Sequence, residues 1–345
     1  MLKYPVLIIE SDDWGAGPAE QAKLLPRIAA VLASRADRTG RNPVMTLGLV
    51  LGVADGVGIG EGCGRDHSKV LDVPEYAAIV AAIKRGTEFG VFALQLHGGE
   101  HYWPPALIAA ARSNPQVAAW LHGPGALATE SLPAALQSRW IDASELPSKA
   151  LRADEIRTAA LTEVVRFRHI FGKQPIVAVP PTFVWNDIVE AAWAEAGVRF
   201  VVTPGQRYHA RDADGMPVPD GQAIVNGDRG AAGIMYLVRD DYFEPARGHR
   251  AERGLAALVA KTRVGRPTLL ETHRANFLGD EMAASAAIRE LERLFTFALA
   301  VFPNVQFLST EELALCMARQ DSRLVEHRLM TRLHVWLRLL TATKC

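Results

Sequence analysis

The chain has 345 residues, of which 49% are hydrophobic and 22% are charged. This content supplies enough apolar side chains for a packed core and excludes intrinsic disorder, and the length suits one α/β barrel as well as two domains. The 38 Lys and Arg residues balance the 38 Asp and Glu residues, so no net positive charge attracts the protein to nucleic acid, and we expect no nucleic-acid partner.

The cysteines and the N-terminus indicate the compartment. Cys63, Cys316 and Cys345 are too few and too far apart for a disulfide framework or for a zinc site made of thiolates. The apolar run 6–9 is too short for the hydrophobic segment of a signal peptide, and no uninterrupted apolar stretch of about 18 residues occurs. We therefore expect a cytoplasmic protein in a reducing environment.

Apolar runs of strand length alternate with segments of helical period along the chain. The candidate strands, of which we expect six or seven to form, are residues 6–9, 45–51, 91–96, 176–179, 200–202, 234–238, 268–270 and 305–308. The predicted helices lie between them at residues 19–32, 75–83, 153–170, 188–196, 254–261 and 283–300. Three stretches rich in Gly and Pro are predicted to be long surface insertions, at residues 52–64, 103–147 and 204–233.

This alternation limits the fold to two candidates. Strands separated by helices pair in parallel through right-handed crossovers, which leaves a closed or partly closed barrel and a doubly wound sheet. Both folds bind their ligands at the C-terminal ends of the strands. Polar residues that directly follow a predicted strand are therefore the candidates for a functional site.

Acidic residues follow the first predicted strand in the sequence Glu10-Ser11-Asp12-Asp13-Trp14-Gly15. Two adjacent carboxylates repel each other unless a cation or a shared proton relieves the repulsion, so the pair is compatible with a metal site. A polar turn in which an aspartate caps the next helix is the alternative. The pair alone does not distinguish the two.

Two histidines follow the predicted strand 91–96, in the sequence His97-Gly98-Gly99-Glu100-His101. A spacing of four places both imidazoles on the same side of one helical turn, close enough to share a divalent ion, and the paired glycines allow the backbone to bend tightly. Because Gly98 follows His97, the sequence does not match the His-Glu start of a metalloprotease helix. Two ordinary loop histidines are the alternative.

The predicted strand 268–270 ends in Glu271-Thr272-His273-Arg274. A histidine there is suited to donate a proton to a leaving group, because its ordinary pKa lies near neutrality. A surface histidine beside an arginine is the alternative. The three clusters together, each at the C-terminal end of a predicted strand, indicate one active site.

These residues resemble the polysaccharide deacetylases of the NodB-homology type, carbohydrate esterase family 4. Asp12-Asp13 matches the aspartate pair that follows the family's first strand, and His97 and His101 match the spacing of its two-histidine motif. Residues 179–183 resemble the family's Arg-Pro-Pro-aromatic motif, and residues 270–273 resemble its late Leu-x-His motif. The resemblance extends from residue 5 to about residue 310.

The resemblance implies a distorted (β/α) barrel of about seven parallel strands with long loop insertions, over residues 1–318. It implies that Asp13, His97 and His101 hold one divalent metal, for which we expect zinc, with cobalt or manganese as alternatives. Asp12 is then the general base and His273 the general acid. The implied reaction removes an N-acyl group, expected to be acetyl, from an amino sugar of a surface polysaccharide or of its nucleotide-linked or lipid-linked precursor.

The sequence departs from the family at two supporting positions. Val179 replaces the arginine that orients the base in the family, and the strand within residues 198–203 lacks the aspartate that supports the acid histidine. Arg274 or Arg239 is a candidate replacement for the arginine, and Glu271 is a candidate for positioning an imidazole.

Other side chains beside the motifs are candidate substrate contacts, because aromatic rings stack on the apolar faces of sugars while polar groups bind hydroxyls. Ordinary packing is the alternative for each of them. They are Trp14, Tyr102, Pro180, Phe183, Trp185, Glu271 and Arg274.

Two other classes of function stay open at this point. The first is a metal-independent glycosidase on a related barrel, which would use two carboxylates such as Asp12 and Glu271. The second is a catalytically inactive protein for carbohydrate binding or assembly, which Val179 in the arginine position suggests.

Residues 319–345 are predicted to form a separate C-terminal amphipathic basic helix, with periodic apolar residues and four arginines between residues 323 and 338. Such a helix can lie on an anionic membrane surface, here through residues 320–345 at the inner face of the membrane. Packing against the barrel or against another subunit is the alternative. The sequence does not indicate an oligomeric state.

Overall fold

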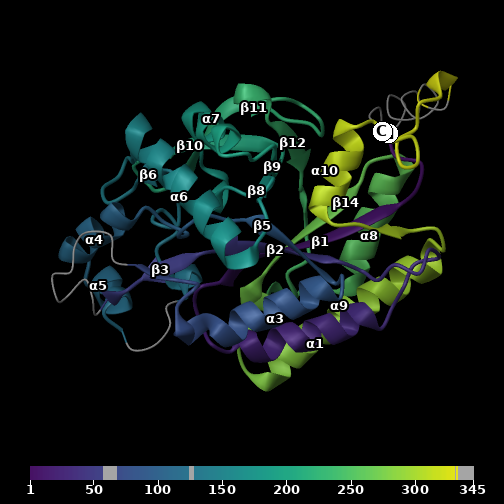
Figure 1. The fold of residues 1–345 in the computed structure, drawn as a ribbon, viewed down its shortest axis with the longest axis horizontal. Coiled ribbons are helices and arrows are strands. Elements are labelled where there is room, and N and C mark those ends of the chain that lie inside the picture. The colour runs from purple at the N-terminus through teal and green to yellow at the C-terminus, as the bar shows by residue number, and fades with distance from the viewer. Residues whose placement is uncertain (57–67, 124–127, 331, 333–345) are drawn as a thin grey trace.

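The computed structural model describes residues 1–56, 68–123, 128–330 and 332 (Figure 1). Within these residues a central sheet has eight strands in the order β12-β9-β8-β5-β2-β1-β14-β13, and β15 pairs with β1 as a ninth. All its pairings are parallel. The strands are β1 (Val6–Gly15), β2 (Met45–Val50), β5 (Phe92–Leu96), β8 (Val177–Ala178), β9 (Phe200–Thr203), β12 (Met235–Val238), β13 (Asp241–Tyr242), β14 (Thr268–His273) and β15 (Gln306–Phe307).

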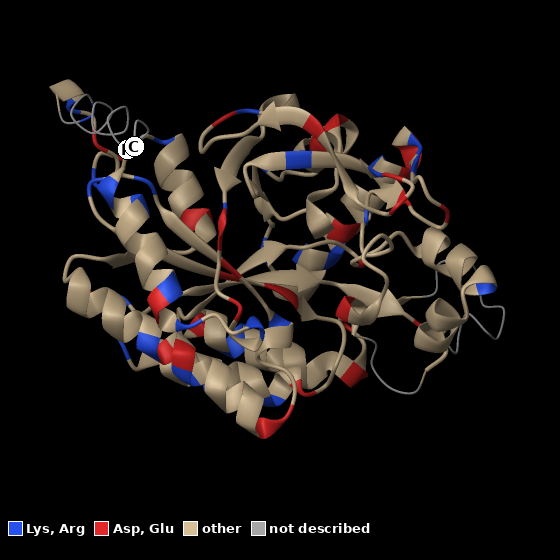
Figure 2. Ribbon diagram, turned by 180° about the vertical axis from the view of Figure 1, so that it is seen from behind, with Lys and Arg blue, Asp and Glu red and all other residues tan. Residues whose placement is uncertain are grey.

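Helices cover the outside of this sheet. They are α1 (Gln21–Ala33), α3 (Ala77–Glu88), α6 (Ala153–Phe171), α7 (Asp187–Glu195), α8 (Ala251–Arg263) and α9 (Glu281–Val301). Helix α1 packs between α3 and α9, while α6 packs against α7 and α8 against α9 (Figure 1). Both charge signs are interspersed over the outer helices, and acidic residues also lie along the central strands (Figure 2).

The sheet curls around an interior, which confirms the predicted distorted (β/α) barrel. Side chains from both halves of the strand order pack in one buried cluster, among them Ile8 of β1, Leu269 of β14, Phe200 of β9 and Leu237 of β12. The terminal strands of the order, β12 and β13, are not paired with each other in the described part of the chain, so the barrel is open there.

Strand alternation divides the interior into an apolar half and a polar half. In β1, Val6 and Ile8 point inward, and because side chains alternate, Glu10 and Asp12 point inward as well. The apolar half lies at the N-terminal ends of the strands, where helix α10 (Thr310–Ala318) closes it with buried apolar side chains. The polar half lies at the C-terminal ends, where the predicted site residues are found.

The predicted insertions contain secondary structure of their own. Residues 103–147 include helices α4 (Pro104–Ser113) and α5 (Pro115–Leu121) and strand β6 (Ile141–Asp142), which pairs with β7 (Lys149–Ala150). Residues 204–233 include the hairpin of β10 (Gln206–Arg211) and β11 (Pro217–Ala223). Part of the insertion at residues 52–64 lies outside the described residues, and the remainder contains β3 (Gly52–Ala54), which pairs with β4 (Ser68–Val70).

The predicted C-terminal helix lies largely outside the described residues. Residues 322–324 form a turn and Val325 bridges to Leu2, whereas residues 329, 330 and 332 are helical. The separation of a segment 319–345 from a barrel 1–318 therefore stays a prediction. None of the helices in the described ranges has the length and apolar character needed to span a bilayer.

Candidate active site

Asp12 and Asp13 lie inside β1, which corrects the prediction that they follow the first strand. The pairing of β1 with β2 shifts register between Ser11 and Trp14, and Asp13 has a backbone φ of +73°. In a regular strand neighbouring side chains point to opposite faces. The irregularity at Asp13 turns its carboxylate toward the same cavity as that of Asp12, and such bulges are common beside active sites.

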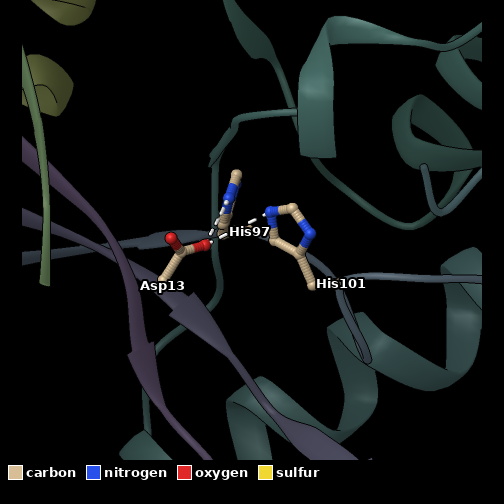
Figure 3. Close-up of side chains that lie close together, drawn as sticks. All are labelled: Asp13, His97 and His101. Atoms are coloured by element: carbon tan, nitrogen blue, oxygen red, sulfur yellow. Dashed lines mark ion pairs between the residues drawn. The ribbon is translucent and has the colours of Figure 1, made fainter. Parts of the chain in front are cut away.

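His97 and His101 follow β5, but they do not share a helical turn as the spacing suggested. Gly98 has φ of +110°, a backbone conformation that ends any helix, so the chain turns sharply before it reaches His101. The two imidazole rings nevertheless meet, with centroids 5.0 Å apart and planes inclined at 64° (Figure 3).

The three predicted metal ligands converge. Asp13 Oδ1 lies 3.4 Å from His97 Nε2 and 3.2 Å from His101 Nε2 (Figure 3). One ligand atom from each of the three residues can be chosen so that all lie within 4.8 Å of one another. All three side chains are buried, with 4–8% of each exposed.

A buried network that the sequence did not suggest holds the histidine loop. The backbone N–H of Gly99 donates to Glu163 Oε2 (2.8 Å), and Trp193 Nε1 donates to the other oxygen of Glu163 (2.7 Å). Arg139 Nη1 donates to Glu100 in the same loop (2.6 Å). Because α6 supplies Glu163, the loop between the two histidines is fixed to the outer helical layer.

The donor set suits a divalent cation. His97 Nδ1 lies 2.9 Å from the carbonyl oxygen of Val179, and since a carbonyl only accepts, the neutral imidazole keeps its proton there and directs the lone pair of Nε2 toward Asp13. Asp13 Oδ1 receives no hydrogen bond from the described residues. Two imidazole nitrogens and one carboxylate oxygen are ligands typical of zinc sites that leave a coordination position open.

The pKa shifts agree with a position for positive charge between these groups. Burial opposes ionisation of Asp13, yet His101, His97 and His273 hold its pKa well below the usual range. Burial lowers the pKa of His101 to about 4, so this imidazole is neutral and able to bind a metal. Burial also opposes protonation of His97, but Asp12 and Asp13 raise its pKa overall.

Asp12 has one oxygen fixed and one oxygen free. Its Oδ2 accepts a hydrogen bond from Arg239 Nη2 (2.6 Å), whereas Oδ1 has no partner within the described part of the chain. Oδ1 faces Gly48, where a β-carbon would lie only 2.2 Å from it. Burial raises the pKa of Asp12, but the charge of Arg239, with those of His97 and His273, lowers it overall. The side chain is therefore an anion that is able to accept a proton at Oδ1.

Arg239, one of the two candidates for the arginine that is absent at Val179, is the one that contacts Asp12. It follows β12, is fully buried, and also contacts Glu10 (2.7 Å) and Glu271 (3.2 Å). Burial opposes its charge, but the three carboxylates raise the pKa of Arg239 well above the usual value. Arg274, the other candidate, instead pairs with Glu130.

His273 ends β14, beside Asp12 in the strand register. Its Nδ1 lies 2.7 Å from Glu244 Oε1, and its Nε2 lies 3.5 Å from Glu271 Oε1, so Glu244 holds the imidazole more closely than the predicted Glu271 does. Burial opposes protonation of His273, but Glu244, followed by Asp13 and Glu271, raises its pKa to about 10. The imidazole is therefore protonated at neutral pH and able to donate a proton.

These groups line one cavity of about 370 Å³ at the C-terminal end of the barrel. Among the predicted site residues it contains Asp12, Asp13, His97, His101, Pro180, Phe183, Glu271 and His273. Residues that the sequence analysis missed also line it, namely Glu130, Ala134, Gln137, Thr182, Glu244, Ala246, Arg247, Ala275 and Asn276.

Three aromatic residues predicted to contact substrate do not line the cavity, because their side chains belong to the core. Trp14 is fully buried and its indole N–H donates to Ser11 Oγ (2.8 Å). The hydroxyl of Tyr102 is buried beside the backbone N–H of Ala54 (2.6 Å), and the indole N–H of Trp185 donates to the buried Glu190 (2.7 Å). Their polar atoms are satisfied inside the protein, away from the cavity.

Arg274, also a predicted substrate contact, does not line the cavity either. Its guanidinium is fully buried and is used by Glu130 (3.0 Å) and by the carbonyl oxygen of Ala16 (3.2 Å). It therefore supports the cavity wall from behind.

No protein-family model matches the sequence, and the search of curated proteins found no match. Among solved structures the chain is similar to a 4-alpha-glucanotransferase from Thermococcus litoralis, with 9% identity and a TM-score of 0.45, over 90% of this chain but only 39% of that one. A protein from Mycobacterium smegmatis assigned to the polysaccharide deacetylases has 13% identity and a TM-score of 0.45, over 95% of both chains. A pseudoenzyme of carbohydrate esterase family 4 from Bacillus anthracis has 10% identity and a TM-score of 0.42, over 90% of this chain and 66% of that one.

These similarities concern the path of the chain, and the chemistry proposed below rests on the side chains of the site itself.

Proposed function

We propose that the protein is a metal-dependent hydrolase that removes an N-acyl group, expected to be acetyl, from an amino sugar. One observation supports this above the others: a single cavity contains a three-residue group able to hold a metal, a separate ionised Asp12 with a free oxygen, and a protonated His273. Amide hydrolysis needs a base for the attacking water and an acid for the departing amine.

Different residues would bind the metal and act as the base. A divalent ion held by Asp13, His97 and His101, with zinc expected and cobalt or manganese as alternatives, would supply a Lewis acid for a carbonyl oxygen and for water. Asp12 accepts the proton of the attacking water at Oδ1, while Arg239 keeps its other oxygen in place.

His273 supplies the acid. Its protonated imidazole donates to the amide nitrogen as the C–N bond breaks, which releases a free amine and a carboxylic acid. Glu244 fixes the orientation of the imidazole through Nδ1 (2.7 Å), and this hydrogen bond leaves Nε2 as the atom that donates to the substrate.

The rest of the cavity suits a sugar. Pro180 and Phe183 present an apolar wall, and polar groups such as Asn276 and Gln137 lie around it. Apolar faces beside a few polar groups are the usual composition of a site that binds a small polar molecule. With the expected cytoplasmic location, the proposed substrate is a precursor of a surface polysaccharide, free or linked to a nucleotide or lipid. The segment 320–345, which contains several arginines, is proposed to contact the membrane surface.

The two alternatives are less compatible with the site. Asp12 and Glu271 both contact the guanidinium of Arg239, whereas the two carboxyl groups of a glycosidase flank the bond that is broken. An inactive protein was suggested by Val179, but Arg239 supplies the charge that Val179 lacks.

The experiment combines metal analysis with activity. We expect about one zinc per chain by elemental analysis, and release of acid from acylated amino sugars by the metal-loaded protein. Asp12→Asn and His273→Ala should each keep the zinc and lose about a hundredfold or more in rate. His209→Ala, at an exposed histidine of β10, is the matched control and should change neither. Full activity in both Asp12→Asn and His273→Ala would refute the assigned roles.

A further inference from the structure

A segment of the chain crosses the mouth of the barrel beside the candidate metal ligands. Residues 129–138, here called the cover segment, begin with a 3₁₀ turn at Thr129–Ser131. At one end Glu130 makes two hydrogen bonds with Arg274, of 3.0 and 3.2 Å. At the other end Ser138 Oγ lies 2.8 Å from Thr182 Oγ1 and accepts from Arg211 (3.2 Å).

The cover segment is a fixed part of the fold. Leu132 and Leu136 are only 4% and 6% exposed, and they pack in a buried cluster with Tyr102, Leu121 and Val184. Opening the segment would expose this cluster and would break the ion pair of the buried Arg274. A segment with buried apolar anchors at intervals along its length opens rarely, because its movement costs the burial of each anchor.

The two attachment points place the cover segment over one side of the cavity. Arg274 directly follows β14 and Thr182 lies in the turn after β8, and the strand order between them is β5, β2 and β1. These are the strands from which Asp13 and His97 come. Between the attachments Ala134 and Gln137 line the cavity.

Exposure within the site differs accordingly. The side chains of Asp13, His97 and His101 are 4–8% exposed, whereas that of His273 is 32% exposed. On the side of His273 the cavity wall continues to Arg247, which is exposed. The cavity is therefore deepest at the metal ligands and shallower at His273, and Ala134 in the cover segment is an exposed lining residue, as Arg247 is.

We propose that this site takes a free acylated amino sugar, or the terminal sugar of a chain, and excludes internal sugars of a polymer. The inference rests on the proposed function and names its substrate class. An internal sugar needs room for the chain on either side of it, and the cover segment, attached at both ends, lies on one of those sides. The volume of about 370 Å³ is near the lower end of the roughly 300–1,000 Å³ of small-molecule sites, which is room for one sugar unit.

The first test is the dependence of binding on chain length. Zinc-loaded Asp12→Asn, which should bind without turnover, is titrated calorimetrically with N-acetylglucosamine and with its linear trimer and pentamer. We expect dissociation constants within about threefold of one another, because only one unit enters the cavity. A groove that binds internal sugars gives an affinity that rises by about tenfold or more along this series, since each tenfold is about 1.4 kcal/mol of added contact. That result, or no binding of any of the three sugars, overturns the inference.

A pair of tryptophan substitutions in the cover segment tests the location. Both positions are exposed, but Ala134 lines the cavity, so Ala134→Trp places an indole there, whereas Ser131 in the same segment is not among the lining residues. In the Asp12→Asn background, we expect Ala134→Trp to weaken binding of the monosaccharide by about tenfold or more and Ser131→Trp to leave it unchanged, with equal zinc content in both. Equal monosaccharide binding by the two variants contradicts the placement of the sugar beneath the cover segment.

Mapping of the product separates this inference from the proposed function. The wild-type protein is incubated with the pentamer, and the deacetylated position is determined by mass spectrometry. Removal of acetyl from a terminal unit supports the inference, and removal from an internal unit overturns it while the hydrolase proposal stands. Length-independent binding of sugar by zinc-loaded wild-type protein without release of acetate refutes the hydrolase and leaves the single-unit site standing.

Discussion

Replacing Arg239 by methionine should destabilise the protein in a way that depends on pH. The guanidinium is fully buried and contacts three buried carboxylates, those of Glu10 (2.7 Å), Asp12 (2.6 Å) and Glu271 (3.2 Å). Removing one partner of a buried ion pair costs about 3–5 kcal/mol, and the total stability of a domain is about 5–15 kcal/mol. Arg239→Met leaves three buried carboxylates without a partner, so its loss of unfolding free energy should reach or exceed the upper end of the range for one ion pair.

The pH dependence follows from the carboxyl groups. Burial raises the pKa of Glu10 and of Glu271 even with Arg239 present, whereas burial of Asp12 is outweighed by Arg239, His97 and His273 together, which lower its pKa. Without the guanidinium the pKa values of Glu10 and Glu271 should lie still further above those of the unfolded chain. An acid with a raised folded pKa stabilises the fold at low pH and loses that contribution as the pH rises through its folded pKa. The loss of unfolding free energy in Arg239→Met should therefore be larger at pH 8 than at pH 5.

Urea unfolding followed by tryptophan fluorescence at both pH values measures this difference. Arg274→Met is the matched control, because Arg274 is equally buried but pairs with one carboxylate, Glu130, whose side chain is 27% exposed. We expect the control to lose about 1–3 kcal/mol, with little dependence on pH, since water can solvate the carboxylate that is left behind. If both variants lose the same unfolding free energy, with the same dependence on pH between 5 and 8, then the charge of Arg239 does not stabilise the three buried carboxylates and the reasoning is refuted.

Three further outcomes are expected. Asp13→Asn should lower zinc affinity by more than about tenfold in a competition assay with a chromophoric chelator, because one of the three ligands loses its charge, and unchanged affinity would remove it from the metal site. Glu244→Gln should lower the pKa of His273 from about 10, because the hydrogen bond to Glu244 is the largest contribution that raises this pKa. The alkaline limb of the pH–rate profile should then move to lower pH. An alkaline limb that does not move contradicts the role of His273 as the acid. Gly48→Ala should lower the rate by about a hundredfold and leave zinc binding unchanged. The new β-carbon would lie 2.2 Å from Asp12 Oδ1, so the carboxylate that acts as the base must move. An unchanged rate would show that Oδ1 is not the proton acceptor.

Most of the predicted site residues that line the cavity could be predicted because they follow an apolar run at the C-terminal end of a strand. The inner face of a parallel barrel strand takes every second residue, and the polar cavity begins where the apolar interior ends, so Asp12, His97 and His273 could be located from their place after an apolar run. Asp13 could be located only through its motif, because its neighbour already points inward and it reaches the cavity through a left-handed backbone conformation.

The remaining errors have local physical causes. Glu244 was missed because the strand before it, Asp241–Tyr242, has two residues and leaves no hydrophobic periodicity to detect. Trp14, Tyr102 and Trp185 were placed in the cavity because they are close to the motifs in sequence, but proximity along the chain does not determine which face a side chain takes. The sequence offered two candidates for the arginine that is absent at position 179. Only the structure shows that Arg239 contacts Asp12, whereas Arg274 pairs with Glu130.

The position of β1 in the sheet has a consequence for how the chain folds during synthesis. This strand precedes the other strands of the sheet in the chain, but β14 along one edge and β15, which shares the other edge with β2, are made more than 250 residues later. The hydroxyl of Thr310 in α10 also completes the hydrogen bonds of Glu10 in that first strand. Pairings between such distant segments form slowly and late. Nascent chains that end before α10 should therefore stay sensitive to protease and depend on chaperones until β14, β15 and α10 have emerged.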